Sequence, residues 1–350
     1  PAFVDVAFFN DGMNGKPLDK YWAGPFKVSE WDSSGKVLTV VRNEKWWGTK
    51  PLLERITWRE MSSQAEQAAF KNNEIDYADA STLSSYNELS TVANVDIRKG
   101  SALAVGNYEI NPEKMPLPVR RAFVAALNRD QLLKLRYEKL GWKENLPGSM
   151  CMLPMQEGYQ DNYPTKLGKD VATKILEDAG YTKNGDYYEK DGTKAGCAVV
   201  VFGDDPTTKG KAQTFTQQMK DVGIEIRIDQ HSDSEFATIL GNWDYDISFS
   251  GYSVSADATE GTKQFYYSEN NEGIGSKEID ALIDAMTLME DDKERNLACN
   301  EIEKKHMAEF AFLGTITNGP DFVMVKKALA NYGPRLYKSM DWTAVGWMNS

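Results

Sequence analysis

The chain has 350 residues, 41% of them hydrophobic and 11% aromatic, which is enough for two or three domains with a well-buried core. This ordinary globular composition excludes disorder over most of the length. The formal net charge of −12 argues against nucleic acid as a partner, because such partners select clustered Lys and Arg. No apolar run approaches the roughly 20 residues that a membrane-spanning helix needs.

The first elements in chain order are predicted to be strands. Residues 26–31 predict a short strand, and residues 32–35, Asp-Ser-Ser-Gly, are typical of a turn, because short polar side chains bond their own backbone there. Residues 37–41 are apolar at nearly every position, so this second strand is predicted to be buried on both faces. A third strand is expected over 53–59.

Residues 1–110 are rich in predicted strands and contain one clear helical pattern, at 62–71. From Pro118 onward, helical patterns alternate with strands, which predicts a mixed sheet covered by helices. The further helices are expected at 118–128, 130–140, 169–180, 208–222, 233–241, 276–290 and 292–311. The further strands are expected at 197–203, 224–229 and 245–250.

Three cysteines, Cys151, Cys197 and Cys299, have no CxxC spacing and match no metal or redox motif. Residues 197–202 predict a buried strand and Cys299 lies in an amphipathic helical pattern, so both are predicted to be buried, inert thiols. In an oxidising compartment one pair could form a disulfide, which would leave one cysteine over.

Signals of catalysis are weak. The chain has two histidines: His306 lies on a charged helix, where a solvated side chain is predicted, and His231 stands at a strand end before a predicted helix cap at Ser232. No HExxH, GxSxG or GxxxxGK[ST] motif is present. We therefore expect no catalytic residue, no metal site and no cofactor, and we predict that the chain is not an enzyme.

One segment has the character of a binding loop. Residues 245–257 leave a core strand and enter a polar loop, with Trp243 and Tyr252 at its flanks as candidates for the wall of a ligand pocket. An aromatic wall would also suit an oligosaccharide, which stacks on indole faces.

A second candidate segment is residues 107–111. Asn107, Glu109 and Asn111 alternate to one face of a strand, while Tyr108 and Ile110 take the other. We expect one of these two sets to approach the ligand.

The order of motifs between residues 24 and 59 closely resembles one family, the extracellular solute-binding proteins of peptide and nickel ABC importers, known as family 5. The motif residues are Gly24-Pro25, Val41-Arg42-Asn43, Trp46-Trp47-Gly48 and Lys50-Pro51, between strands of the matching type. Further segments that resemble the family follow at matching distances, at 72–76, 108–111, 116–130, 169–181, 218–224, 243–251 and 275–282. The resemblance covers nearly the whole chain.

This resemblance implies an α/β protein with a bilobal, periplasmic-binding-protein-like type II fold, in which two mixed-sheet lobes are joined by a two-strand hinge. Residues 1–110 with 317–350 are expected to form lobe I, and residues 111–316 to form lobe II. The hinge residues are expected to be Asn111, Pro112, Thr317 and Asn318. Family members carry a long stretch before Gly24-Pro25, so the chain is expected to be the larger C-terminal part of a longer protein that lacks the N-terminal part of lobe I. The alternative is a compact variant of the family that begins near Pro1.

The resemblance also implies a function: capture of a solute between two lobes and its delivery to an ABC importer permease. Oligopeptides are the expected ligands, and the expected location is the extracellular face of the cell membrane or the periplasm. We expect a monomer that contacts the membrane only through a lipid anchor outside this chain.

The loop after the strand at 245–250 departs from the family's peptide pattern. Peptide-binding members place an acidic residue there that pairs with the α-ammonium of the peptide, and the matching position is Ser255. Asp257 lies two residues further on, and Ser253 two residues before. Either Asp257 takes this role through a shifted loop, or the ligand has no free amine; a solvated Asp257 without function is the third possibility.

Three alternatives to peptide transport stay open at this point. The first is a binding protein for a non-peptide solute such as an oligosaccharide, and the second is a receptor-like sensor without transport. The third belongs to another class, a secreted glycoside hydrolase, which needs two opposed carboxylates in its cleft. The sequence offers no clear pair of this kind.

Overall fold

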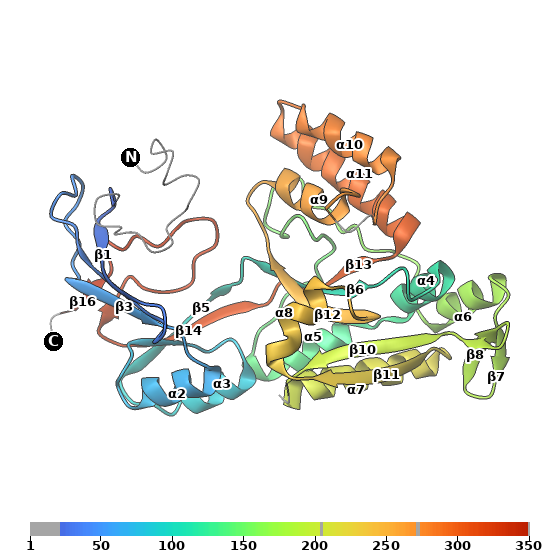
Figure 1. Cartoon of the computed structure of the whole chain (residues 1–350), viewed down its shortest axis with the longest axis horizontal. Helices are drawn as coiled ribbons and strands as arrows, with labels where there is room; N and C mark the ends of the chain where they lie inside the picture. The colour runs from blue at the N-terminus through green and yellow to red at the C-terminus, as the bar shows by residue number, and fades with distance from the viewer. Residues whose placement is uncertain (1–21, 204–205, 271–273, 349–350) are drawn as a thin grey trace. The chain divides into compact units, whose positions relative to one another are not determined.

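A computed structural model describes residues 22–203, 206–270 and 274–348. The chain divides into two compact units, residues 1–101 with 320–350 and residues 102–319 (Figure 1). The chain thus passes between the units at 101/102 and 319/320, whereas we expected 110/111 and 316/317. The difference arises because β6 (Ala104–Ile110) pairs with strands of the second unit on both sides. Of the predicted lobe I, residues 1–21 lie outside the described part.

The first unit contains two three-stranded sheets. The predicted strands form β1 (Phe26–Asp32), β2 (Val37–Arg42) and β3 (Arg55–Arg59), in antiparallel order. The predicted turn at 32–35 is confirmed, because Asp32 Oδ1 accepts from the backbone N–H groups of Ser34 and Gly35 at 3.0 and 2.8 Å.

The second sheet of this unit has the order β4-β14-β5. Its strands are β4 (Tyr77–Asp79), β14 (Pro320–Lys326) and β5 (Val95–Ser101), accompanied by α2 (Ser63–Lys71) and α3 (Leu83–Leu89). The short strands β15 (Leu329–Ala330) and β16 (Gly346–Trp347) pair with each other. The helix α3 was not predicted. It has only seven residues, and its main signal is a reciprocal cap in which the side chains of Thr82 and Ser85 bond each other's backbone N–H.

The second unit is built on a five-stranded sheet of order β11-β10-β12-β6-β13. The neighbours of β6 are β10 (Gly196–Phe202), β11 (Glu225–His231), β12 (Ile247–Ser253) and β13 (Leu313–Thr317). β10 runs parallel to β11 and β12, while β6 runs antiparallel to both β12 and β13. The sheet is therefore mixed, as the alternation of helices and strands predicted.

The predicted helices of this unit are present with shifted ends. They are α4 (Leu117–Ala126), α5 (Arg129–Tyr137), η3 (Glu138–Leu140), α6 (Lys169–Asp178), α7 (Pro206–Asp221), η4 (Asp233–Glu235), α8 (Phe236–Gly241), α10 (Lys277–Thr287) and α11 (Asp292–Phe310). A small antiparallel sheet of β7 (Thr182–Asn184), β8 (Tyr187–Lys190) and β9 (Thr193–Lys194) follows α6.

One further helix was not predicted from the sequence, α9 (Ala258–Tyr266). Its buried residues are Ala258, Thr262, Phe265 and Tyr266, whose spacing of three and four places them on one helical face. Only packing against α10 and α11 makes so short a pattern helical.

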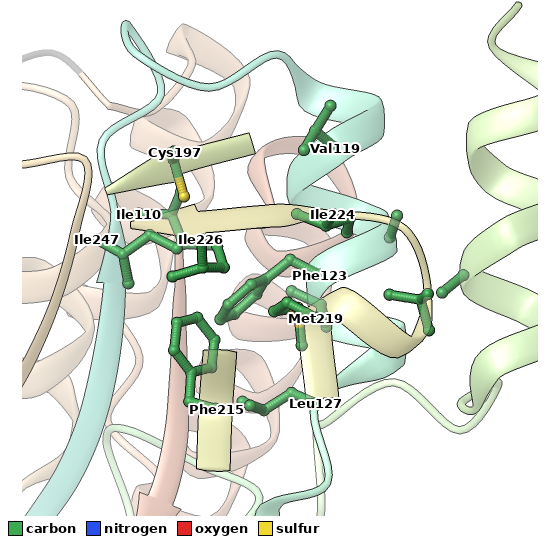
Figure 2. Packing of buried hydrophobic residues seen from close by; sticks show 14 of the residues in the cluster. Ile110, Val119, Phe123, Leu127, Cys197, Phe215, Met219, Ile224, Ile226 and Ile247 are labelled. Atoms are coloured by element: carbon green, nitrogen blue, oxygen red, sulfur yellow. The ribbon is translucent and has the colours of Figure 1, made fainter. Parts of the chain in front are cut away.

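Two apolar clusters cover opposite faces of the five-stranded sheet. Tyr108 and Ile110 of β6 belong to the cluster formed with α4, α6 and α7, and Val105 belongs to the cluster formed with α9, α10 and α11. In the first cluster, the Phe123 ring makes edge contacts with Tyr108 and Phe215, each with ring centroids 5.2 Å apart (Figure 2). These aromatic contacts join the sheet to α4 and α7.

All three cysteines are buried and none forms a disulfide. Cys197 packs in the first cluster, and Cys151 and Cys299 pack in the second. Burial raises the pKa of the Cys299 thiol, which keeps it in its unreactive protonated form. The prediction of buried thiols at Cys197 and Cys299 is confirmed.

The predicted solvation of His306 is wrong. Its side chain is 1% exposed and packs between the rings of Tyr266 and Phe310, with centroids 4.7 and 4.8 Å away. A helix with charged residues on its outer face can still turn one polar residue inward, and the pattern around His306 did not reveal that face. His231, by contrast, is accessible and pairs with Asp229 and Glu235.

Phe123→Ala should destabilise the second unit by about 3–5 kcal/mol, because it removes a ring from between two others and leaves a cavity. Urea unfolding followed by circular dichroism measures this loss. Leu288→Ala is the control, because Leu288 is 82% exposed and its loss should cost less than about 0.5 kcal/mol. Equal effects of the two substitutions would contradict the central place of Phe123.

His306 should make the protein less stable in mild acid. Burial lowers the pKa of His306 to about 4, whereas the unfolded chain binds this proton near pH 6.5. Because the unfolded state then holds the extra proton, stability should fall by about 1–2 kcal/mol from this group between pH 7 and pH 5.

His306→Leu should therefore lose less stability than the parent protein when urea unfolding is compared at pH 7 and pH 5. His231→Gln is the matched control, because the bonds of His231 to Asp229 and Glu235 raise its pKa. Protonation of His231 in mild acid should therefore stabilise the folded protein, whereas protonation of His306 destabilises it. The same acid loss in the parent and in His306→Leu would show that His306 does not titrate in this way.

Candidate ligand-binding site

The pairing of β6 with β12 brings the two predicted binding segments together. Asn107 lies opposite Ser250, and Ala104 lies opposite Ser253. The backbone N–H of Val254 donates to the carbonyl of Leu103 at 3.1 Å, which extends this pairing beyond the end of β12. The loop that follows β12 therefore starts next to the first residues of β6 (Figure 1).

This loop, residues 253–257, is held by bonds from within the second unit. The side-chain amide of Gln156 donates to the carbonyls of Ser255 and Ala256 at 3.3 and 3.1 Å. The Ser255 hydroxyl accepts from the N–H of Asp257 at 3.2 Å. A loop fixed in this way presents its side chains in one conformation.

Asp257 has a structural role that the sequence pattern did not reveal. Its Oδ1 accepts from the N–H of Thr259 at 2.9 Å, which makes Asp257 the N-cap of α9. The side chain is exposed, and within the described part of the chain it forms no ion pair. One carboxylate oxygen of this exposed side chain thus caps the helix.

Tyr252 and Trp243 pack into the interior of the unit. The Tyr252 hydroxyl donates to Glu109 Oε1 at 2.6 Å, and the Tyr245 hydroxyl donates to Glu109 Oε2 at 3.1 Å. Trp243 stacks between Tyr245 and Phe312, with ring centroids 5.7 and 5.6 Å away. Both residues stay partly exposed, so their predicted contact with a ligand stays a prediction.

Glu109 is a buried carboxylate, only 7% exposed. Burial raises its pKa, and the two tyrosine hydroxyls that donate to it counteract part of this rise. The sequence signal for this group is the alternation of polar residues in 107–111, which marks one face of β6 as polar. The carboxylate orients Tyr252 directly beside the candidate loop.

Asn107 opens onto a small cavity whose other polar residues are Arg136, Lys211, Ser250 and Thr317. The Asn107 Nδ2 atom is buried and has no hydrogen-bond partner among the described residues. Arg136 and Lys211 are cationic, and the amide nitrogen of Asn107 is a donor. The cavity has a volume of about 20 Å³, which is the space of a single water molecule, and the donors around it favour an anionic group next to it over a cation. Sequence analysis did not identify Arg136 and Lys211, because they lie on helices and join Asn107 only in the folded unit.

The predicted hinge residues lie in the second unit. Asn111 is buried, with its Nδ2 bonded to the Trp243 carbonyl at 3.2 Å, and Pro112 accepts from Arg120 Nη1 at 3.0 Å. Asn111 and Pro112 are thus held inside the second unit, several residues after the passage at 101/102.

Thr317 and Asn318 lie just before the second passage between the units. The Glu144 carboxylate accepts from the Thr317 hydroxyl, from the N–H of Asn318 at 2.9 Å and from the N–H of Gly319 at 2.8 Å. Glu144 therefore fixes the last residues of the second unit, and a hinge role for Thr317 and Asn318 stays a prediction.

The described residues contain no group of three or more His, Cys, Asp or Glu side chains placed to hold a metal ion. Within the same ranges, no helix has both the length and the apolar character required to cross a bilayer.

Comparison with known sequences gives one family and a set of oligopeptide-binding relatives. The profile of the bacterial extracellular solute-binding proteins, family 5 middle region, matches residues 4–273. The oligopeptide-binding protein OppA of Mycobacterium bovis is 30% identical over 353 residues, which is 97% of this chain and 58% of that protein. The chain thus spans somewhat more than half the length of this relative.

Solved structures share the fold at low sequence identity. The periplasmic EDTA-binding protein EppA matches with a TM-score of 0.80 and 22% identity, over 93% of this chain and 65% of that one. The oligopeptide-binding protein AppA from Bacillus subtilis, in complex with a nonapeptide, matches with a TM-score of 0.72 and 20% identity. The match covers 93% of this chain and 66% of that one.

The implied α/β, bilobal binding-protein fold is confirmed by these neighbours, and with it the motif-based resemblance. Proteins of this family bind solutes and are not enzymes. The chain belongs to the bacterial extracellular solute-binding proteins of family 5.

Proposed function

We propose that this protein captures oligopeptides and delivers them to the permease of an ABC importer. The observation that carries the proposal is the presence of opposite charges around the paired strands β6 and β12. Asp257 offers a carboxylate after the end of β12, and Arg136 and Lys211 offer cations beside Asn107. A peptide in zwitterionic form has an ammonium and a carboxylate that match these two groups.

The loop after β12 also suits the backbone of an extended peptide. Main-chain hydrogen bonds supply affinity to an extended peptide, and pockets receive its side chains. The exposed residues Ser253, Ala256 and Asp257 leave this loop accessible within the second unit. The loop is fixed by Gln156, so it loses little conformational freedom when it binds.

The resemblance to family 5 supports the further parts of the proposal. The protein works at the extracellular face of the membrane or in the periplasm, as a monomer held by a lipid anchor outside this chain. The hinge positions, with Thr317 and Asn318 nearest a passage between the units, allow a ligand to favour one conformation over another. OppA and AppA are oligopeptide-binding by name, whereas EppA binds EDTA, so the ligand class needs a direct test.

Mass spectrometry of small molecules released from the protein, after purification from its host and denaturation, tests the ligand class. We expect short peptides of mixed sequence. Recovered oligosaccharides or metal chelates in place of peptides would overturn the peptide assignment and leave the binding function intact. Recovery should fall when the protein is first dialysed against partly denaturing urea, as for any reversibly bound solute.

Asp257→Asn should weaken peptide binding about ten- to a hundredfold, because hydrogen bonds to charged groups contribute roughly 1.5–3 kcal/mol. Titration calorimetry with a recovered or synthetic peptide measures the change. Stability should hardly change, because Asn caps a helix about as well as Asp.

Asp291→Asn is the matched control for this experiment. Asp291 is the N-cap of α11 and accepts from the N–H of Glu294 at 2.9 Å, so it has the same structural role and charge away from the loop. Peptide affinity should be unchanged in Asp291→Asn. An equal affinity in Asp257→Asn would show that Asp257 does not bind the peptide ammonium.

A further inference from the structure

The second unit contains a pocket that is separate from the candidate ligand site. It has a volume of about 440 Å³ and lies between α4, α6, α11 and the segment 161–166. Volumes of roughly 300–1,000 Å³ are typical of small-molecule sites. The pocket is therefore large enough for a ligand of its own.

The position of the pocket follows from the chain path. α4 begins shortly after the Ile110 end of β6, whereas the candidate loop 253–257 lies next to the Ala104 end. A strand of this length spans about 20 Å. The two sites thus lie at opposite ends of β6.

The wall of the pocket is mainly apolar. It is formed by Val124 and Ala125 of α4, Ile175 of α6, and Met307 and Ala308 of α11. These side chains would cover an aliphatic or aromatic group, and burial of such a group contributes about 25 cal/mol per Å². An apolar body is the first property that the pocket requires of a ligand.

The charged residues of the pocket are mostly cations. Arg121, Lys166 and Lys304 line it together with one carboxylate, Asp161, so its lining has a net positive charge. Arg121 and Lys166 form no ion pair with any described residue. Lys304 is partly compensated by Glu301 at 2.9 Å.

The neighbouring Arg120 adds to this positive charge. It is buried and donates only to carbonyls, those of Phe310, Pro112 and Met115. Burial, and next to it the charge of Arg121, lowers the pKa of Arg120 to about 10. Two adjacent guanidinium groups without a carboxylate favour an anion nearby.

The floor of the pocket contains an unsatisfied polar atom. Asn162 is 6% exposed, and its Nδ2 donates to Asn300 Oδ1 at 2.9 Å and to Glu303 Oε2 at 2.6 Å. These two acceptors fix the orientation of the amide and leave Oδ1 buried without a partner among the described residues. A water held beneath a bound ligand would satisfy this oxygen.

We propose that this pocket is a second binding site, for a small amphipathic carboxylate whose apolar body packs on α4, α6 and α11 and whose anionic head lies between Arg121 and Lys166. Binding at this second site does not involve the peptide ligand of the proposed function. The second site can therefore be tested whether or not the protein binds peptides.

The probe is 3-phenylpropanoate, with its neutral methyl ester as the control. Both have the same apolar body and neither has a hydrogen-bond donor, so a difference in affinity reports the anionic head. We expect the carboxylate to bind with a dissociation constant of about a millimolar and the ester to bind about five- to tenfold more weakly.

Methyl NMR of protein labelled at methionine locates the binding. Met307 lines the pocket, and Met152 packs in the same cluster as Val254 of the candidate loop. The probe should shift the Met307 signal and leave the Met152 signal unchanged. A shift of Met152 alone, or no shift at millimolar probe, would overturn the proposal.

Lys166→Glu should weaken binding of 3-phenylpropanoate about three- to tenfold, because it reverses one of the two unpaired charges at the pocket. Lys169→Glu is the control, since Lys169 is exposed at the start of α6 and does not line the pocket. Ala308→Trp, at an exposed pocket position, should fill the pocket and abolish binding while the circular dichroism spectrum stays unchanged. Equal effects of the two lysine substitutions would show only a general charge effect and would overturn the site.

Discussion

The pairing of β6 on both of its edges is the constraint on which the second unit depends. β6 bonds β12 along its whole length on one side and β13 on the other. Because successive side chains of a strand face opposite ways, this pairing sends Tyr108 to one apolar cluster and Glu109 to a polar face. A slip of one residue would exchange the two faces and bury the wrong set. The candidate loop 253–257 starts from this register, because Ser253 pairs with Ala104 at one end of β6.

The polar face of β6 explains how a ligand site can be rigid without being apolar. Glu109 is buried, and a buried carboxylate is costly unless its oxygens accept hydrogen bonds. Tyr245 and Tyr252 supply these bonds, and in doing so they fix the strand and its neighbour side by side. Gln156 and the N-cap at Asp257 hold the following loop in the same way. The atoms that would meet a solute are thus set in place before it arrives, which reduces the entropy lost on binding.

Sequence reasoning identified one part of the candidate site and overlooked another. The loop 253–257 and Asn107 were identified because a core strand ends in a polar loop and because polar residues alternate along 107–111. Arg136 and Lys211 come from helices with ordinary charged patterns, where a cation facing a cavity and a cation facing solvent look the same. The N-cap role of Asp257 was overlooked for a related reason: α9 has nine residues, and its helical pattern is too short to stand out.

The sequence by itself determined the family, the mixed α/β character and the positions of most helices and strands, because each of these depends on local order: motif spacing, hydrophobic period and turn residues. It also indicated that Cys197 and Cys299 are buried, from a run of strand residues around the first and an amphipathic helical pattern around the second. Only the tertiary structure decided that β6 belongs to the second unit, that His306 faces inward, and that Arg121 and Lys166 share a pocket. These features depend on which distant segments meet, and that is set by the packing of whole faces, which no local pattern contains.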